Sequence, residues 1–374
     1  MDWGNPAGAQ MRRPGGLRVA WASLFAALCL ALPIGGTAQG TRPRPAAPLE
    51  AIPAILDAFR SYRVVSFPGG HTGGNEVQAL LRALVKDPRF AATVNDIVVE
   101  FGSSRYQDLM DRFIRGEDVP PSALQRAWLD AVQGGTALDN DNTALFFSAV
   151  REANATVPAE RRIRVLLGDP PIDWENIRSG SDYRKWVVQR DTYPADLIRR
   201  EVLAHNRRAL IVWANGHLLH LEILTNYDMT NWQAQTIVSL IEAQGGAPVF
   251  TVRAEGSLSE WQPDAASWKP MSLTLVRGTI MGAADFSEFE NPSQRYRIRG
   301  DDDFVPIPRD QWVKRPLEDI VDAVLYVGPA SGRTSAAISR TLCADPAYIK
   351  MRLDRIALLN MAEADKVKRD CNLK

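Results

Sequence analysis

Short apolar runs alternate with helical patterns through the first two thirds of this chain, and this alternation limits the folds that it can adopt. Between the first two runs, apolar residues recur at helical spacing at Val77, Leu80, Leu81, Leu84 and Val85. Strands that alternate with helices along a chain usually form a parallel sheet, in which the helices are the crossover connections. The sequence therefore predicts an α/β fold with a mostly parallel central sheet flanked by helices. The expected strands are Val64–Phe67, Asp96–Phe101, Arg164–Gly168, Ala209–Trp213 and Pro248–Val252.

Polar side chains follow four of these strands, at the point where each strand ends. They are His71, Glu100, Asp169 and His217. The carboxyl ends of parallel strands meet at one edge of a sheet, so we expect these side chains to converge there. An aspartate at a strand end often caps the next helix, which favours a structural role for Asp169.

Two imidazoles beside a carboxylate suit two kinds of chemistry. One is general acid–base catalysis, in which a histidine activates water or a nucleophile. The other is ligation of haem or a divalent metal by the imidazole nitrogens. The spacing of the residues does not decide between them. The sequence has no HExxH pair, nucleophile elbow, P-loop or dinucleotide fingerprint.

The N-terminus has the pattern of a secretory signal peptide. Arginines precede a short apolar run, Val19–Leu32, and small residues follow up to Ala38. We expect residues 1–38 to be removed on export to the periplasm or outside the cell, which leaves no transmembrane anchor. Residues 39–48 are a proline-rich linker. After cleavage Cys343 and Cys371 remain, either as a disulfide or as two unpaired core cysteines.

The mature chain divides by pattern into two parts. Residues 49–255 are expected to form the α/β core, and residues 256–374 a C-terminal extension with lid-like loops. The extension also contains a late strand, Asp322–Gly328, and a terminal helix, Pro346–Lys366. Lys and Arg total 44, as do Asp and Glu, so the net charge is zero and nothing indicates a nucleic-acid partner. We expect a small-molecule ligand or substrate.

The four strand-end motifs resemble those of a known group of proteins. They read FPGGHTGG at His71, IVVEFG at Glu100, RVLLGDPPIDW at Asp169 and IVWANGHL at His217. The chain resembles the erythromycin-esterase/ChaN-like superfamily, related to the Tiki/TraB proteins and often labelled haem-binding uptake or esterase-like. The resemblance covers roughly Tyr62 to Val252. It implies an esterase-like hydrolase of an unknown small substrate, in which His71 is the base, Glu100 its partner and His217 a second acid–base or stabilising group.

The sequence departs from the superfamily pattern at the first turn. Gly69 stands where the superfamily has a glutamate, and we expect it to leave a gap in the site. Glu76 is a candidate replacement, although an acidic residue at a helix start also suits the helix dipole. Arg105 and Asp169 complete the supporting residues. Loss of the glutamate keeps two alternatives open: a haem- or metal-binding protein with His71 and His217 as ligands, and a pseudoenzyme that serves as a binding module.

Overall fold

The computed structural model forms one compact unit from residue 42 to residue 374. The predicted signal peptide, residues 1–38, lies outside the residues that the structure describes. His71 also lies outside them. The described residues are 43–70, 74–133, 135–223, 234–243, 246–258, 261–289, 296–299, 303–306, 308, 310 and 314–373.

The centre of the unit is a five-stranded sheet in the order β4-β3-β5-β2-β8. Every pairing in it is parallel, and β2 lies between β5 and β8 with Val65 beside Leu210. The predicted α/β fold with a mostly parallel sheet is confirmed. The strands are β2 (Val64–Pro68), β3 (Asp96–Ser103), β4 (Arg164–Asp169), β5 (Ala209–Trp213) and β8 (Val249–Phe250).

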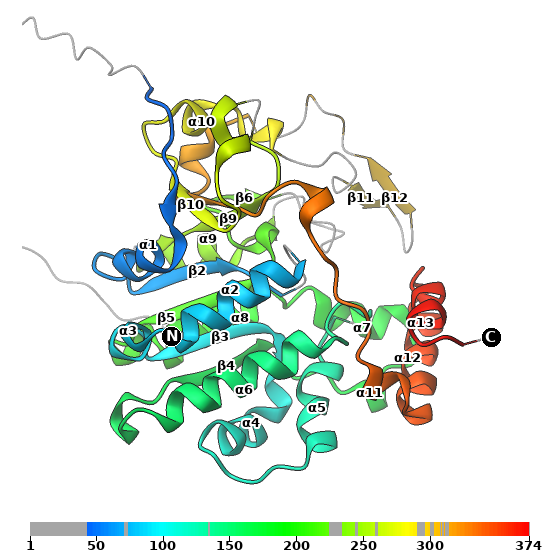
Figure 1. Cartoon of the computed structure of the whole chain (residues 1–374). Helices are drawn as coiled ribbons and strands as arrows, with labels where there is room; N and C mark the ends of the chain where they lie inside the picture. Colours follow the sequence, from blue (N-terminus) through cyan, green and yellow to red (C-terminus); the bar gives the residue numbers. More distant parts are fainter. Residues whose placement is uncertain are drawn as a thin grey trace, which may run out of the picture. The chain divides into compact units, whose positions relative to one another are not determined.

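Helices cover both faces of this sheet, which explains why its strands are apolar on both sides. In β5, Leu210 and Val212 pack against one set of helices, while Ile211 and Trp213 pack against another. The first set is on the near side in Figure 1 and consists of α1 (Ala51–Ala58), α2 (Gly74–Lys86), α3 (Pro88–Thr93), α4 (Gln107–Ile114), α5 (Pro121–Leu129) and α6 (Asp141–Ala155). The second set consists of α8 (Thr192–Glu201) and α9 (Ile237–Glu242).

A second sheet, in the order β1-β10-β13-β9, takes two of its strands, β10 and β13, from the C-terminal extension. The late strand β13 pairs in parallel with β9 and antiparallel with β10. The described part of the extension is thus more regular than the sequence pattern indicated. The elements are β1 (Leu49–Glu50), β9 (Val252–Glu255), β10 (Ser272–Leu275), β13 (Ala323–Tyr326) and the short helix α10 (Ile280–Ala283). Two hairpins complete the strands: β6 (Glu222–Ile223) with β7 (Ala234–Gln235), and β11 (Tyr296–Arg299) with β12 (Asp303–Pro306).

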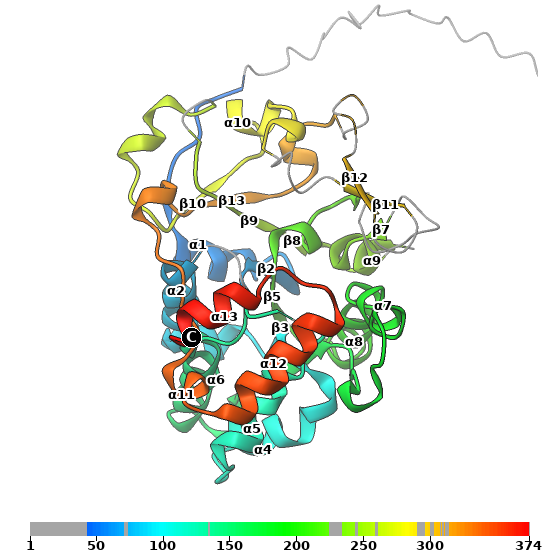
Figure 2. The ribbon, with the colours of Figure 1, turned by 90° about the vertical axis from the view of Figure 1, so that its right-hand side faces the viewer.

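Three helices end the chain, and Figure 2 shows them together: α11 (Arg340–Cys343), α12 (Pro346–Leu358) and α13 (Ala364–Asp370). The predicted single helix Pro346–Lys366 is wrong, because Asn360 adopts a left-handed φ of 52° and ends α12. The predicted disulfide is confirmed. Cys343 is bonded to Cys371 with a Cα–Cα distance of 5.0 Å. The disulfide joins α11 to the residue after α13, and residues 340–371 are called the C-terminal hairpin below.

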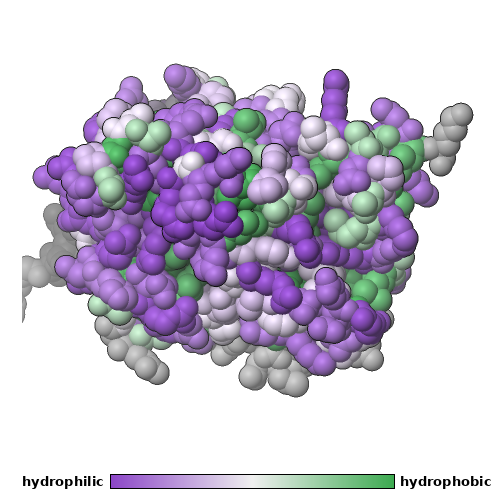
Figure 3. Space-filling view, turned by 90° about the horizontal axis from the view of Figure 1, so that it is seen from below, coloured by the Kyte–Doolittle hydropathy of each residue, from purple (hydrophilic) through white to green (hydrophobic). Residues whose placement is uncertain are grey.

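The surface is mainly polar where it can be seen. Figure 3 shows a face on which hydrophobic residues occur in small groups among hydrophilic ones. Within the described ranges, no helix is both long and apolar enough to cross a membrane.

Candidate functional site

Glu100 is the centre of a buried ionic cluster at the carboxyl end of the central sheet. Its side chain is fully buried near the end of β3. Nη2 of Arg190 lies 2.5 Å from its Oε1, and the amide of Ala214, just after β5, donates to its Oε2 over 3.1 Å. A guanidinium and a backbone N–H together satisfy a buried carboxylate, which would otherwise be costly to bury.

Arg190 also pairs with Asp169, at the end of the neighbouring strand β4. Nε of Arg190 lies 3.4 Å from Oδ1 of Asp169, whose Oδ2 accepts a hydrogen bond from the amide of Val132. Asp169 thus does not cap the following helix, because its carboxylate accepts from a different connection, and its expected structural role stays a prediction. Burial raises the pKa of Asp169 to about 7, although Arg190 and the Val132 amide oppose the shift. Glu100, Asp169 and Arg190 are called the ionic cluster below.

His217 lies at the end of β5 and is oriented by a carboxylate. Its Nδ1 donates to Oδ1 of Asp191 over 2.8 Å, which leaves Nε2 as the ring nitrogen for a substrate. Burial lowers the pKa of His217, but the charge of Asp191 and the hydrogen bond to it more than offset this, so the pKa is raised. Arg190, the residue before Asp191, pairs with Glu100, and the amide of Ala214, three residues before His217, donates to the same carboxylate, so His217 lies close to the ionic cluster.

Arg190 and Asp191 are consecutive in the chain, and the sequence prediction missed both. They occupy the turn between α7 (Gly180–Val187) and α8, so one short turn holds both Glu100 and His217. The sequence pattern predicts helices from about Tyr183 to His205 but does not locate the turn between them. Pro194, in the first turn of α8 after Asp191, was the available signal for a helix start there.

The turn after β2 brings its backbone against Glu100. Gly70 adopts a φ of 64°, and a Cβ added to it would overlap with Oε2 of Glu100. Gln78 of α2 donates from Nε2 to the carbonyl of Gly70 over 2.7 Å, which fixes the turn from the helix side. His71 follows Gly70 in the sequence but is not among the described residues, so its place in the site stays a prediction.

The structure corrects the expectation of a gap at Gly69. A Cβ at this position would overlap with Cγ1 of Val212, in the adjacent strand β5. The amide of Gly69 donates to the carbonyl of Trp213 over 2.9 Å, so the backbone continues the sheet here. The space for a side chain is filled, and the residue with a left-handed φ is Gly70.

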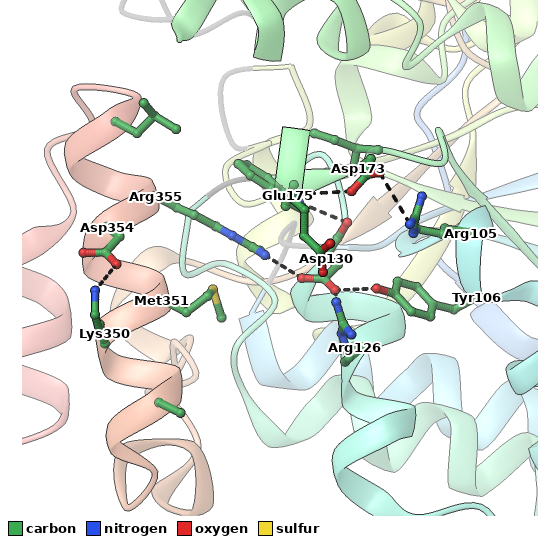
Figure 4. Close-up of a pocket in the computed structure, with 14 residues that line it drawn as sticks. Arg105, Tyr106, Arg126, Asp130, Asp173, Glu175, Lys350, Met351, Asp354 and Arg355 are labelled. Atoms are coloured by element: carbon green, nitrogen blue, oxygen red, sulfur yellow. Dashed lines mark hydrogen bonds and ion pairs between the residues drawn. The ribbon is translucent and has the colours of Figure 1, made fainter. Parts of the chain in front are cut away.

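Two of the predicted supporting residues take part in other contacts. Glu76 accepts a hydrogen bond from Oγ1 of Thr334 over 2.8 Å, and this hydrogen bond lowers the pKa of Glu76. Arg105 lies 3.5 Å from Asp173 and lines a separate cavity of about 450 Å³ (Figure 4). Among the supporting residues, only Asp169 contacts Arg190 in the described part of the chain.

The haem or metal site that the sequence predicts as an alternative includes His71, which is not among the described residues. Within the described ranges, no three His, Cys, Asp or Glu side chains gather in a way that could hold a metal. The cavity that borders Gly70 has a volume of about 220 Å³ and is lined by the polar side chains of Asn75, Gln78 and Asn142, among others. It is smaller than the usual range for bound organic molecules, about 300–1,000 Å³.

Comparisons with known proteins agree with this architecture. No family model matches the chain, and no curated protein matches it. A succinoglycan biosynthesis protein is similar in structure, with a TM-score of 0.51 and 10% identity over 76% of this chain and 94% of that one. The likeness is one of fold.

Two further solved structures align over similar lengths with lower scores. A Bacillus cereus protein has a TM-score of 0.47 and 12% identity, over 76% of this chain and 95% of its own. A mutant erythromycin esterase in its open conformation has a TM-score of 0.44 and 11% identity, over 77% of this chain and 94% of its own.

Proposed function

We propose that this chain is an esterase-like hydrolase of a small substrate. The observation that carries the proposal is the placement of the Asp191–His217 pair beside the ionic cluster, at the ends of adjacent parallel strands. A histidine whose Nδ1 is held by a carboxylate presents Nε2 for proton transfer. The sequence resemblance to the erythromycin-esterase/ChaN-like superfamily supports the same reading.

In the proposed reaction, His71 accepts a proton from water while the water oxygen attacks the ester carbonyl. The raised pKa of His217 favours its imidazolium form, which suits a proton donor. His217 donates from Nε2 to the leaving alkoxide, so that an acid and an alcohol are released. Glu100 is held in place by Arg190 and the Ala214 amide, and its carboxylate stabilises the protonated forms of both imidazoles.

Hydrolysis of a panel of small esters tests the proposal. We expect His217→Ala and His71→Ala each to lower the rate by about 10²–10⁴, the range for loss of a general acid or base. His205→Ala is the matched control, because His205 is exposed at the end of the short helix Leu203–His205 and should have no effect. Equal rates in wild type and His217→Ala reject the hydrolase role.

A binding role without catalysis is the second candidate, and a specific contact favours it. The glutamate of the superfamily turn is replaced by Gly69, and Val212 occupies the space that its side chain would need. A site that has lost both the group and the space for it has the character of a pseudoenzyme. Wild-type protein that binds esters and hydrolyses none of them would support this candidate.

Export is proposed on separate grounds. The disulfide Cys343–Cys371 is of a kind that persists in oxidising compartments, and the N-terminal pattern is that of a signal peptide. Mass spectrometry of exported protein should show that about the first 38 residues are absent. An exported chain that retains Met1 would contradict this.

A further inference from the structure

The C-terminal hairpin contacts the same short segment that supports the ionic cluster. This segment, residues 129–133, begins at the last residue of α5 and is called the bridging segment below. On one side, the amide of Val132 donates to Asp169, and Oε1 of Gln133 lies 3.4 Å from Nη2 of Arg190. On its other side it meets helix α12.

Arg355 of α12 makes the main contact with the bridging segment (Figure 4). Its Nη1 donates to the carbonyl of Leu129 over 2.8 Å, and its Nη2 lies 2.6 Å from Oδ1 of Asp130. The same guanidinium stacks over Trp174, 4.1 Å from the ring centroid, and the indole N–H donates to the carbonyl of Asp130 over 3.2 Å. One arginine thus fixes both the backbone and a side chain of the segment.

Further contacts attach the hairpin just beyond the bridging segment. Arg352 and Tyr348 of α12 bind the buried carboxylate of Asp139 at 2.5 and 2.6 Å. Glu363, immediately before α13, accepts from the amide of Thr136 over 2.7 Å. The disulfide closes the hairpin that carries all these groups, and both of its cysteines are half-buried.

We propose that the C-terminal hairpin is a positioning element for the ionic cluster and that reduction of Cys343–Cys371 loosens it. A dithiol reductant transfers two electrons to the disulfide, gives two cysteine thiols and becomes a cyclic disulfide itself. Without the cross-link, α12 and α13 hold the bridging segment less firmly, and the Val132 amide is held less closely to Asp169. The consequence for catalysis rests on the proposed hydrolase function, whereas the structural link does not.

Hydrogen exchange of the full chain, followed by mass spectrometry, tests the link without any substrate. We expect peptides that contain the bridging segment to exchange about tenfold faster after treatment with dithiothreitol, while β2 and β5 are unchanged. Arg355→Ala with the disulfide intact should give the same increase. Lys350→Ala is the matched control, since Lys350 lies on the same helix and pairs with Asp354 in an exposed contact of 2.6 Å.

The outcomes separate the two proposals. Unchanged exchange of the bridging segment in folded reduced protein, or in Arg355→Ala, overturns the positioning role. If reduction unfolds the chain, as circular dichroism would show, Arg355→Ala decides alone. With an active wild type, Arg355→Ala should lower kcat about tenfold and change KM less than about twofold, because the hairpin acts on the ionic cluster and not on substrate binding. An inactive wild type with faster exchange rejects the hydrolase role and leaves the link standing.

Discussion

The guanidinium of Arg190 lies 2.5 Å from the carboxylate of Glu100, and both side chains are buried. Arg190→Met removes this cation from Glu100 and Asp169 together. We expect a loss of about 3–5 kcal/mol in the free energy of unfolding, the usual cost of breaking a buried ion pair on one side. Urea unfolding measures it. The control is Arg200→Met on the exposed side of α8, where the change should stay within about 0.5 kcal/mol. Equal free energies of unfolding in the two variants would contradict a stabilising role of the buried Arg190–Glu100 pair.

Asp169 should make the stability depend on pH in an unusual direction. Its pKa rises from an ordinary 3.8 to about 7 on folding, so between these values the folded state holds more protons than the unfolded state. Stability from this group is therefore greatest below about pH 4 and falls as the pH rises to 7. In unfolding measurements from pH 5 to pH 8, wild type should lose stability relative to Asp169→Asn. A constant difference between the two proteins would show that Asp169 does not titrate there.

His220 should give a second pH dependence, in a higher range. Its Nδ1 contacts Glu242 and its Nε2 contacts Asp322, both at 2.9 Å. Burial lowers the pKa of His220, but the two carboxylates raise it to about 9 overall, from an ordinary value of 6.5. The folded state then holds the extra proton, so this stabilisation is complete below pH 6.5 and is lost as the pH rises through about 9. Between pH 6 and pH 10, the melting temperature should fall less steeply in His220→Gln than in wild type.

Asp191→Asn should lower the pKa of His217 while the fold is retained. The change removes the negative charge next to Nδ1 and leaves a side chain of the same size. Nuclear magnetic resonance titration of the imidazole signals measures the shift, and His205 is the control, since it makes no contact with Asp191 among the described residues. A His217 signal that titrates at the wild-type pH would show that Asp191 does not govern its charge.

Gly70→Ala should destabilise the protein more than Gly278→Ala does. Both glycines have a left-handed φ, 64° and 71°, so both alanines meet the same backbone strain. Only at position 70 does the new Cβ overlap with a neighbour, Oε2 of Glu100, while position 278 is open. We expect an extra loss of about 1–3 kcal/mol at position 70. Calorimetry of the two variants provides the comparison, and equal melting temperatures would argue against a tight Gly70–Glu100 contact.

The central sheet was predictable from the sequence because its strands are buried on both faces. Continuous apolar runs gave Ala209–Trp213 with the bounds that the structure has. The two-residue strand β1 was not predictable, because its pairing with β10 depends on residues more than 200 positions away. Asn360 was a visible signal for the end of α12, but the apolar pattern on both sides of it concealed the break.

The site was predictable only in part, for a related reason. Strand ends carry a local signal, so Glu100, Asp169 and His217 could be placed at one edge of the sheet in advance. Arg190 and Asp191 come from a turn between two helices, and only the tertiary structure brings that turn to the strand ends. The strand-end pattern also says nothing about the neighbour that fills the space beside Gly69.

That neighbour limits how the site could change by mutation. A side chain at position 69 would overlap with Cγ1 of Val212, so a glutamate there requires Val212 to move or a smaller residue at position 212. Neither step is favourable alone: Gly69→Glu meets a clash, and Val212→Ala opens a cavity in the core, at a cost of up to a few kcal/mol. Positions 69 and 212 are therefore coupled, and the effects of Gly69→Glu and Val212→Ala on the free energy of unfolding should not add.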